Sequence, residues 1–281
     1  MNTLPKTVCI IPCFNEIRRF SASHFNLFVH KYPNIAFVFV NDGSTDETEK
    51  KLLELAKQCP DNMHCVSLPC NRGKGEAVRQ GMLFAIAQYP SCKYLGYWDA
   101  DLATPLFLIP EFLRVFSERP YCQVVIGSRI KSAGRDIQRN FFRHYLGRIV
   151  ASCTQILLRP NCYDTQCGAK IFAHTNALRV ILQKSFVSRW IFDIELLLRL
   201  RNILGVAQLS DWNAVAFELP LSVWHEQGHS KIRIRDALLI PYYILRIYID
   251  SKKFPKSGTI TSVQISSSPP PPCENTHDSP A

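Results

Sequence analysis

The sequence of 281 residues lacks an apolar run long enough to cross a membrane as a helix. A spanning helix needs about 20 consecutive apolar residues. The best candidate, Ala237–Ile249, is shorter and contains Pro241 and Arg246. The N-terminal sequence also lacks an apolar stretch long enough for a secretory signal. We therefore expect neither a spanning helix nor a signal peptide, and Ala237–Ile249 is better suited to lie on a membrane than to cross it.

Paired metal-ligating cysteines are also missing. The 11 cysteines include no CxxC pair, and the CxxxxC arrangement of Cys162 and Cys167 has neither a second pair nor matching histidines. A zinc site is therefore not expected. The cysteines are instead expected to be free, mostly buried thiols in a reducing compartment.

The sequence also lacks a recognisable nucleic-acid-binding module. The net charge of +10 predicts an anionic partner, but charge alone does not choose between nucleic acid, a phosphorylated substrate and an anionic membrane surface. The basic residues do not cluster around aromatic residues in any recognised nucleic-acid-binding module. Nucleic acid is therefore not predicted as a partner.

The first half of the chain alternates short apolar runs with amphipathic segments. The runs are rich in β-branched and aromatic residues and lack strict alternation, which is typical of strands buried on both faces of a parallel sheet. They lie at Thr7–Ile11, Ala36–Val40, His64–Leu68, Tyr94–Trp98 and Gln123–Gly127. Helices are predicted at Thr48–Gln58, behind a capping box from Ser44 to Glu47, and at Glu76–Tyr89. This order predicts a doubly wound α/β sheet.

The second half has a more helical pattern. Apolar helices that carry arginine are expected at Asn140–Leu158 and Arg189–Leu204. Short strands are expected at Val206–Leu209 and Val215–Leu219. Ser257–Ala281 contains a run of serine and proline and is expected to be a disordered tail.

Polar motifs follow four of the predicted strands. They are Pro12-Cys-Phe14-Asn-Glu16, Asn41-Asp42-Gly-Ser-Thr-Asp, Asn71-Arg-Gly-Lys74-Gly and Asp99-Ala-Asp101. Each has an ordinary structural explanation when taken alone, as a turn, a helix cap or a surface acid. In a parallel sheet, however, the carboxyl ends of the strands meet at one edge, where ligands bind. A lysine at a helix N-terminus favours a phosphate, and carboxylates at i and i+2 can hold Mg²⁺ or Mn²⁺ beside a departing diphosphate.

These four motifs, in this order and spacing, resemble those of family 2 glycosyltransferases. The resemblance extends from about Thr7 to about Lys253. Within the family it points to the polyprenyl- or dolichyl-phosphate hexosyltransferases, and to the dolichyl-phosphate β-glucosyltransferases in particular. The segments that resemble this branch are Asp164-Thr-Gln-Cys-Gly-Ala-Lys170, Arg189-Trp-Ile-Phe-Asp193-Ile-Glu195, Trp224-His-Glu and Ser230-Lys231.

The resemblance implies a fold and a division of the chain. The fold is the GT-A fold, a Rossmann-like, doubly wound and mostly parallel α/β sheet, with C-terminal membrane-proximal helices. The GT-A domain would occupy residues 5–222, the amphipathic membrane-proximal helices residues 223–256, and the disordered tail residues 257–281.

The resemblance also assigns roles to single residues. Nucleotide contacts are expected from Pro12, Phe14, Glu16, Asp42 and Lys74. Catalytic roles are expected for Asp99, Asp101, Asp164 and Asp193, of which Asp99 and Asp101 would bind the metal. The acceptor phosphate is expected to meet Arg129, Arg143 and Lys231.

The implied activity is the inverting transfer of a hexose from a nucleotide sugar to a polyprenyl or dolichyl phosphate, with Mg²⁺ or Mn²⁺. Ala103 stands where mannosyl transferases of this kind usually carry glutamine, which favours UDP-glucose and leaves GDP-mannose open. A lipid acceptor implies a peripheral location on the cytosolic face of a membrane. A membrane-spanning partner subunit or a homo-oligomer would be compatible with this activity.

Several alternatives stay open at this point. A family 2 enzyme with a soluble glycan acceptor is disfavoured by the Asp164–Lys170 segment. A nucleotidyltransferase usually carries a basic, glycine-rich loop after its first strand, where this chain has Pro12–Glu16. A degenerate membrane-bound scaffold is disfavoured by the intact acids and Lys74. The helices at Asn140–Leu158 and Ile232–Lys253 could also be ordinary packing helices with solvated charges.

Overall fold

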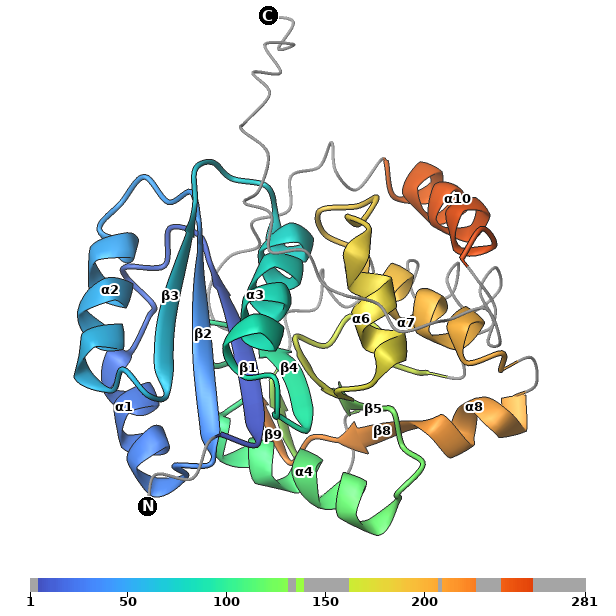
Figure 1. Cartoon of the computed structure of the whole chain (residues 1–281), viewed down its shortest axis with the longest axis horizontal. Helices are drawn as coiled ribbons and strands as arrows, with labels where there is room; N and C mark the ends of the chain where they lie inside the picture. Colours follow the sequence, from blue (N-terminus) through green and yellow to red (C-terminus); the bar gives the residue numbers. More distant parts are fainter. Residues whose placement is uncertain (1–4, 131–134, 139–161, 207–208, 226–238, 255–281) are drawn as a thin grey trace, which may run out of the picture.

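The computed structural model describes residues 5–130, 135–138, 162–206, 209–225 and 239–254. A seven-stranded sheet with the order β3-β2-β1-β4-β7-β5-β8 forms the centre of this part of the chain (Figure 1). Its strands are β1 (Thr7–Cys13), β2 (Ile35–Asp42), β3 (Met63–Leu68), β4 (Tyr94–Trp98), β5 (Val124–Ser128), β7 (Ala169–Ala173) and β8 (Ala216–Pro220). A two-stranded sheet pairs β6 (Asp136–Gln138) with β9 (Val223–His225).

The direction of the strands determines where the polar motifs lie. β7 pairs antiparallel with both β4 and β5, while the other pairings in the large sheet are parallel. The carboxyl ends of β1 to β5 therefore share one edge, and the segment that precedes β7 reaches the same edge. The five strands predicted in the first half, the strand predicted at Val215–Leu219 (β8) and the mostly parallel sheet are confirmed, whereas β7 was not predicted.

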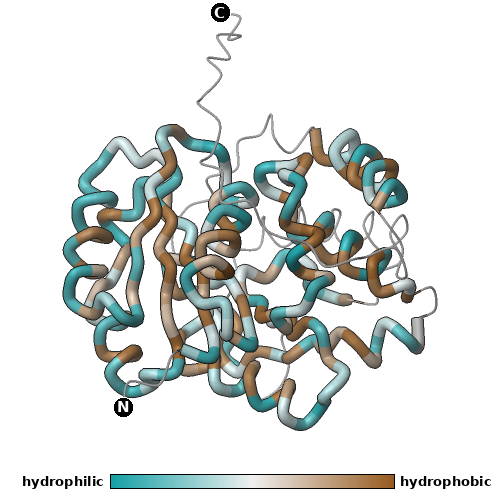
Figure 2. Tube along the Cα trace, in the orientation of Figure 1, coloured by the Kyte–Doolittle hydropathy of each residue, from teal (hydrophilic) through white to brown (hydrophobic). Residues whose placement is uncertain are grey.

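Both faces of the sheet are covered by helices (Figure 1). One face packs against α1 (Ala22–Lys31), α2 (Thr48–Gln58), η1 (Leu106–Leu108) and α4 (Ile109–Glu118). The other packs against α3 (Lys74–Gln88), α6 (Asn176–Gln183), α7 (Phe192–Ile203) and α8 (Leu209–Val215). In β2, Phe37 faces the first group and Val38 the second, so the strand is buried on both sides. This explains the unbroken apolar runs, which Figure 2 shows as hydrophobic central strands.

A smaller apolar cluster joins α10 (Ile240–Ser251) to α7. Ile244 and Ile247 of α10 are fully buried there against Ile191, Ile194 and Leu198. Within the described residues, no helix combines the length and the hydrophobicity that spanning a membrane requires.

Four details differ from the sequence predictions. The helix predicted from Arg189 begins at Phe192, and Leu209 begins α8 instead of ending a strand. The capping box before α2 does not form, because Asp46 accepts the N–H of Thr48 at 3.0 Å and no side-chain bond caps the helix from its N-cap residue. Among the cysteines that the structure describes, eight carry free thiols, six of them buried, but Cys70 is disulfide-bonded, contrary to the expectation of free thiols. The predictions at Asn140–Leu158 and Ser257–Ala281 lie outside the described residues.

Candidate active site

Asp99, directly after β4, is held between Lys74 and Gly168. Lys74 begins α3, and its Nζ lies 2.5 Å from Asp99 Oδ1. Gly168 lies against the same carboxylate, because a Cβ built there would stand 1.8 Å from Asp99 Oδ2. Burial opposes the charge of Lys74, but the acids around it, led by Asp99 and Asp193, raise its pKa above the ordinary value. Lys74 therefore stays charged and is the nearest cation to Asp99 among the described contacts.

The negative charge of Asp101 is compensated less well than that of Asp99. The N–H of Ala103 donates to Oδ1 at 3.1 Å, and the Arg19 guanidinium comes only within 3.8 Å of Oδ2. Arg19 also binds both oxygens of Glu16, at 2.8 and 3.0 Å. Burial, followed by the charge of Asp99, raises the pKa of Asp101 to about 6. A cation beside Asp101 would relieve this unfavourable charge.

The two acids fit a divalent metal of the hard, oxygen-binding kind. The described residues contain no group of three or more His, Cys, Asp or Glu side chains placed to hold a metal. Mg²⁺ at phosphate sites typically uses one or two carboxylates and takes its other ligands from water and phosphate oxygens. Asp101 has the weaker cationic contact and is the better ligand, while Asp99 engages Lys74.

Asp42 anchors the turn that leads into α3. Its carboxylate is 3% exposed and accepts the backbone N–H groups of Arg72 at 2.7 Å and Gly73 at 2.8 Å. Burial raises the pKa of Asp42 to about 6, although these two bonds lower it. Gly73 has a φ of 92°, and an added Cβ would meet the Arg189 side chain at 2.6 Å. Asp42 and Gly73 together fix the turn from which Lys74 reaches Asp99.

The other predicted nucleotide residues follow β1 at the same edge. Pro12 lies near the end of the strand and Phe14 follows it, and both are half-buried. Glu16 is buried and its N–H donates to Thr48 Oγ1 at 2.8 Å, which joins this segment to α2. The structure thus brings the predicted nucleotide residues of three strand ends to one edge of the sheet.

Arg129 and Asp164, predicted for different roles, form one ion pair. Arg129 follows β5 and donates from Nε and Nη2 to the two oxygens of Asp164, at 2.7 and 2.6 Å. Its guanidinium lies 5.2 Å from the centre of the Trp224 ring. The N–H of Asp164 donates to Glu218 on β8 at 2.8 Å. Burial opposes the charge of Arg129, but Asp164 raises its pKa well above the ordinary range. The pair joins the end of β5 to the segment before β7 at the carboxyl edge of the sheet.

Asp193 lies beneath this edge and not on it. It is 3% exposed and accepts hydrogen bonds from the Tyr97 hydroxyl and from Lys170 Nζ, the latter at 2.5 Å. Lys170 is fully buried on β7 and also donates to the Cys167 carbonyl at 2.7 Å. The carboxylate of Asp193 is therefore committed to β4 and β7, and any effect on the reaction would pass through its neighbours.

Glu195 and Arg199 form a second buried pair on α7. Glu195 also accepts the N–H of Val187 at 2.7 Å, and Arg199 donates to the carbonyls of Ile181 and Lys184 at 2.9 and 2.6 Å. Burial raises the pKa of Glu195, although Arg199 lowers it. This pair fixes the connection between α6 and α7.

Sequence reasoning missed Arg19 and Tyr97. Arg19 follows Glu16 by three residues, but its approach to Asp101 depends on the fold. Tyr97 was counted only as a strand residue, and nothing in the sequence showed that its hydroxyl would meet α7. Arg143 and Lys231 lie outside the described residues.

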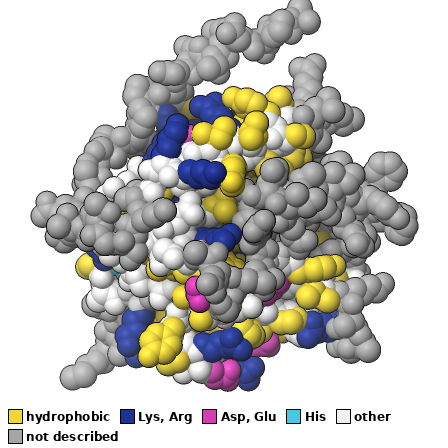
Figure 3. All heavy atoms as spheres, turned by 90° about the vertical axis from the view of Figure 1, so that its right-hand side faces the viewer, with side chains coloured by type: hydrophobic (Ala, Val, Ile, Leu, Met, Phe, Trp, Pro, Cys, Tyr) yellow, Lys and Arg dark blue, Asp and Glu magenta, His cyan; other side chains and the backbone are white. Residues whose placement is uncertain are grey.

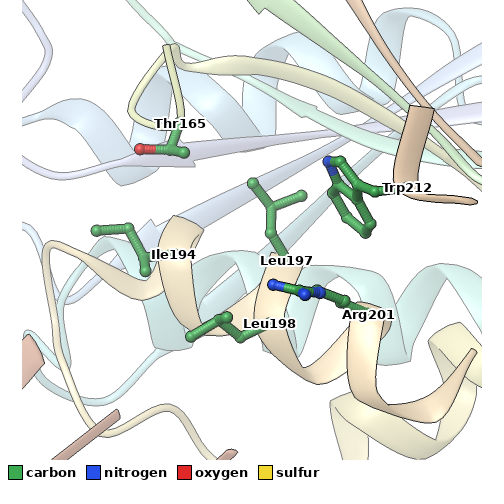
Figure 4. A pocket seen from close by; sticks show the side chains of 6 residues that line it. All are labelled: Thr165, Ile194, Leu197, Leu198, Arg201 and Trp212. Atoms are coloured by element: carbon green, nitrogen blue, oxygen red, sulfur yellow. The ribbon is translucent and has the colours of Figure 1, made fainter. Parts of the chain in front are cut away.

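A small apolar pocket lies between α7, α8 and the segment before β7. Thr165, which precedes β7, and Trp212 of α8 face four side chains of α7 across it (Figure 4). Those four are Ile194, Leu197, Leu198 and Arg201. None of the acids that follow β4 lines this pocket, so it is not the reaction site.

The fold and the site together define a class of protein. A mostly parallel α/β sheet with paired acids after β4 is the architecture of GT-A glycosyltransferases. The structure is similar to that of glucosyl-3-phosphoglycerate synthase from Mycobacterium tuberculosis, with a TM-score of 0.62. The match covers 90% of this chain and 83% of the other, at 18% sequence identity, and it establishes the fold.

The family follows from the sequence comparison. The model of glycosyl transferase family 2 matches residues 8–174. A dolichyl-phosphate beta-glucosyltransferase of Trichomonas vaginalis is 30% identical over 87% of this chain and 76% of its own length. Those of Saccharomyces cerevisiae and Homo sapiens are 29% and 27% identical, over 87% and 80% of this chain and 77% and 74% of their own lengths. The chain belongs to glycosyl transferase family 2 and is a glycosyltransferase.

Proposed function

We propose that this glycosyltransferase moves glucose from UDP-glucose to dolichyl phosphate or a related polyprenyl phosphate at the cytosolic face of a membrane. The observation that carries the proposal is the acid pair after β4, with Lys74 beside Asp99 and Arg129 after β5 at the same edge of the sheet. The relatives named as dolichyl-phosphate beta-glucosyltransferases support this donor and acceptor. A solved complex of the mycobacterial synthase contains Mn²⁺ and UDP-glucose, which supports the same donor and a divalent metal.

Lys74 and the two acids serve the donor side of the reaction. A divalent cation held by Asp101, with Asp99 beside it, would neutralise the charge that develops on the departing diphosphate. Lys74 exchanges part of its contact with Asp99 for a diphosphate oxygen. Asp42 keeps the turn before Lys74 in place, and Glu16 holds Arg19 close to Asp101.

The acceptor phosphate needs positioning more than it needs a base. Its second pKa is about 6, by analogy with phosphoserine, so most of it is dianionic at neutral pH. A phosphate oxygen attacks C1 of glucose, the bond from C1 to the UDP oxygen breaks, and UDP leaves with the electron pair. Attack opposite the leaving group inverts the α-linked donor to a β-linked product. Both Asp164 and Asp193 are engaged with cations, which agrees with a reaction that uses no carboxylate base.

Arg129 is the acceptor-side cation among the described residues. It presents a planar guanidinium suited to phosphate, and Asp164 and Trp224 hold that guanidinium in place. Arg143 and Lys231 stay candidates from the sequence for the same role.

Transfer of labelled sugar into organic extract tests the proposal. The purified chain is given UDP-glucose or GDP-mannose, dolichyl phosphate and Mn²⁺, beside Asp101→Asn and the exposed α2 control Glu54→Gln. We expect label from UDP-glucose to appear in the extract, and to disappear in Asp101→Asn and when a chelator removes the metal. The anomeric configuration of the product tests inversion. Label from GDP-mannose instead would change the donor, and label confined to a water-soluble glycan would contradict the lipid acceptor.

A further inference from the structure

The outer face of α10 carries large apolar side chains that nothing in the described structure covers. They are Leu239 at 46% exposed, Tyr242 at 53%, Leu245 at 53% and Ile249 at 48%, and we call them the outer stripe. Their spacing of three or four residues places them along one side of the helix. The opposite side is the buried one that packs on α7. α10 therefore has two apolar sides, one buried in the protein and one facing outward.

Basic residues border the outer stripe. Arg246 is exposed beside it and donates from Nη1 to the Tyr242 hydroxyl at 3.1 Å. Lys252 and Lys253 are exposed just after the helix ends. Asp250 is the single acid of α10, and it lies 3.3 Å from Lys253. Figure 3, which views the side of the molecule that carries α10, shows hydrophobic and basic side chains gathered near the top of this face.

We propose that the outer stripe of α10 docks the protein on an anionic lipid membrane. A short amphipathic helix with aliphatic and tyrosine side chains on one side and arginine and lysine at its border suits the interface between headgroups and acyl chains. The charge of this face favours an anionic membrane over a second copy of the chain as its partner. A second copy of the chain would bring the same basic border against itself, in a protein of net charge +10, whereas anionic headgroups complement it.

The position of α10 connects docking to the proposed transfer but does not depend on it. The buried side of α10 packs against Ile191, Ile194 and Leu198, which belong to α7 and its N-cap, the helix that also carries Asp193. Docking would thus bring the membrane within one helix of the residues beneath the active site. Because binding to vesicles needs neither donor nor acceptor, it can be measured independently of the reaction.

Co-sedimentation with lipid vesicles tests the docking. The full chain is mixed with vesicles of phosphatidylcholine alone or of phosphatidylcholine with phosphatidylserine. The double variant Leu245→Glu with Ile249→Glu should bind the anionic vesicles at least about tenfold more weakly, because two apolar side chains lose their burial and two negative charges are added. The matched control is Leu27→Glu with Leu53→Glu on α1 and α2, two leucines that are 73% and 43% exposed. This control should change binding far less than the stripe variant.

Arg246→Gln is a second, milder variant on a fully exposed side chain, and it separates charge from apolar contact. It should lower binding to anionic vesicles about fivefold and leave binding to neutral vesicles unchanged. Equal losses in the stripe variant and the α1/α2 control would overturn the proposal. So would concentration-dependent dimers, seen by light scattering, that vanish in the stripe variant, because they would assign the stripe to a second copy. In detergent with solubilised acceptor, the stripe variant should keep its transfer activity, so a failure of docking is distinguishable from a failure of the proposed reaction.

Discussion

The carboxyl edge of the sheet and the layer beneath it use the same kind of ion pair in different surroundings. At the edge, the rim pairs are Lys74–Asp99 and Arg19–Asp101, whose side chains are between 21% and 33% exposed. Beneath it, the buried pairs are Lys170–Asp193 and Arg199–Glu195, whose side chains are at most 4% exposed. A rim pair can exchange its partner for a ligand at little cost, whereas a buried pair that loses a partner leaves an uncompensated charge. The rim is thus suited to bind a ligand, and the buried layer is suited to hold the rim residues in position.

The two layers are also coupled. Asp193 contributes, after Asp99, to the raised pKa of Lys74, although it lies below the edge. Tyr97 of β4 joins Asp193 directly and stands two residues before Asp99. A change in the buried layer is therefore expected to reach the rim through β4 and through charge.

Breaking a buried pair should have the largest effect on stability. Lys170→Met leaves Asp193 with the Tyr97 hydroxyl but without its cation, and should lower the free energy of unfolding by about 3–5 kcal/mol. Denaturant unfolding measures this loss. Lys74→Met, the same change at the rim, should cost less than about 1 kcal/mol. Similar losses in both variants would remove the distinction between the two layers.

A double variant shows whether the loss comes from charge. Lys170→Met combined with Asp193→Asn removes both charges and keeps an acceptor for the Tyr97 hydroxyl. It should recover most of the stability lost in Lys170→Met. A double variant as unstable as Lys170→Met would assign the loss to packing of the lysine side chain.

Asp101→Asn should have the largest effect on activity. Removal of the charge weakens the divalent-metal site and should lower kcat/KM by about 10²- to 10³-fold, with the fold unchanged. Transfer assays with Mn²⁺ titration measure the loss, and Glu54→Gln serves as the control on an exposed acid of α2. Activity of the variant at saturating Mn²⁺ that equals the wild-type value would place the metal elsewhere.

The rim was predictable from the sequence because each of its acids follows a strand. Apolar runs defined β1 to β4, and the parallel arrangement then brought Asp42, Asp99 and Asp101 to one edge. Lys74 was placed by the glycine turn before α3. Local pattern and sheet direction were sufficient in this half of the chain.

The buried layer was not predictable in the same way. β7 is short and runs against its neighbours, so the partner of Lys170 could not be inferred from strand order. Asp193 and Glu195 fall in the apolar helix predicted at Arg189–Leu204, where a buried acid needs a partner. The partners of Asp193, Lys170 and Tyr97, depend on tertiary packing. The pairing of Arg129 with Asp164 likewise depends on the approach of β5 to the segment before β7.

Lys74 of the rim and Arg129, which follows β5 at the same edge of the sheet, provide a smaller test. Lys74→Gln removes a charge from the diphosphate side and should weaken UDP binding by about 30- to 100-fold. Arg129→Gln should raise the KM for the lipid phosphate and leave UDP affinity near the wild-type value. Calorimetry with UDP and kinetics with varied acceptor measure the two effects. Loss of UDP affinity in both variants would show that the two cations share one phosphate site.

The smallest expected effect is a gain in stability when the charge of Asp101, which burial and Asp99 make unfavourable, is removed. In the folded chain the pKa of Asp101 is about 6, above its ordinary value of 3.8, so the folded state holds this proton more tightly than the unfolded state. The stability that Asp101 contributes is therefore full below its unfolded pKa and is lost as the pH rises through about 6. Asp101→Asn removes this penalty and, without metal, should stabilise the chain by about 1–2 kcal/mol near pH 7 and by about half as much near pH 5. Thermal unfolding at the two pH values measures the difference. A gain that does not change with pH would mean that Asp101 ionises normally and that the rim carries no electrostatic strain for a metal to relieve.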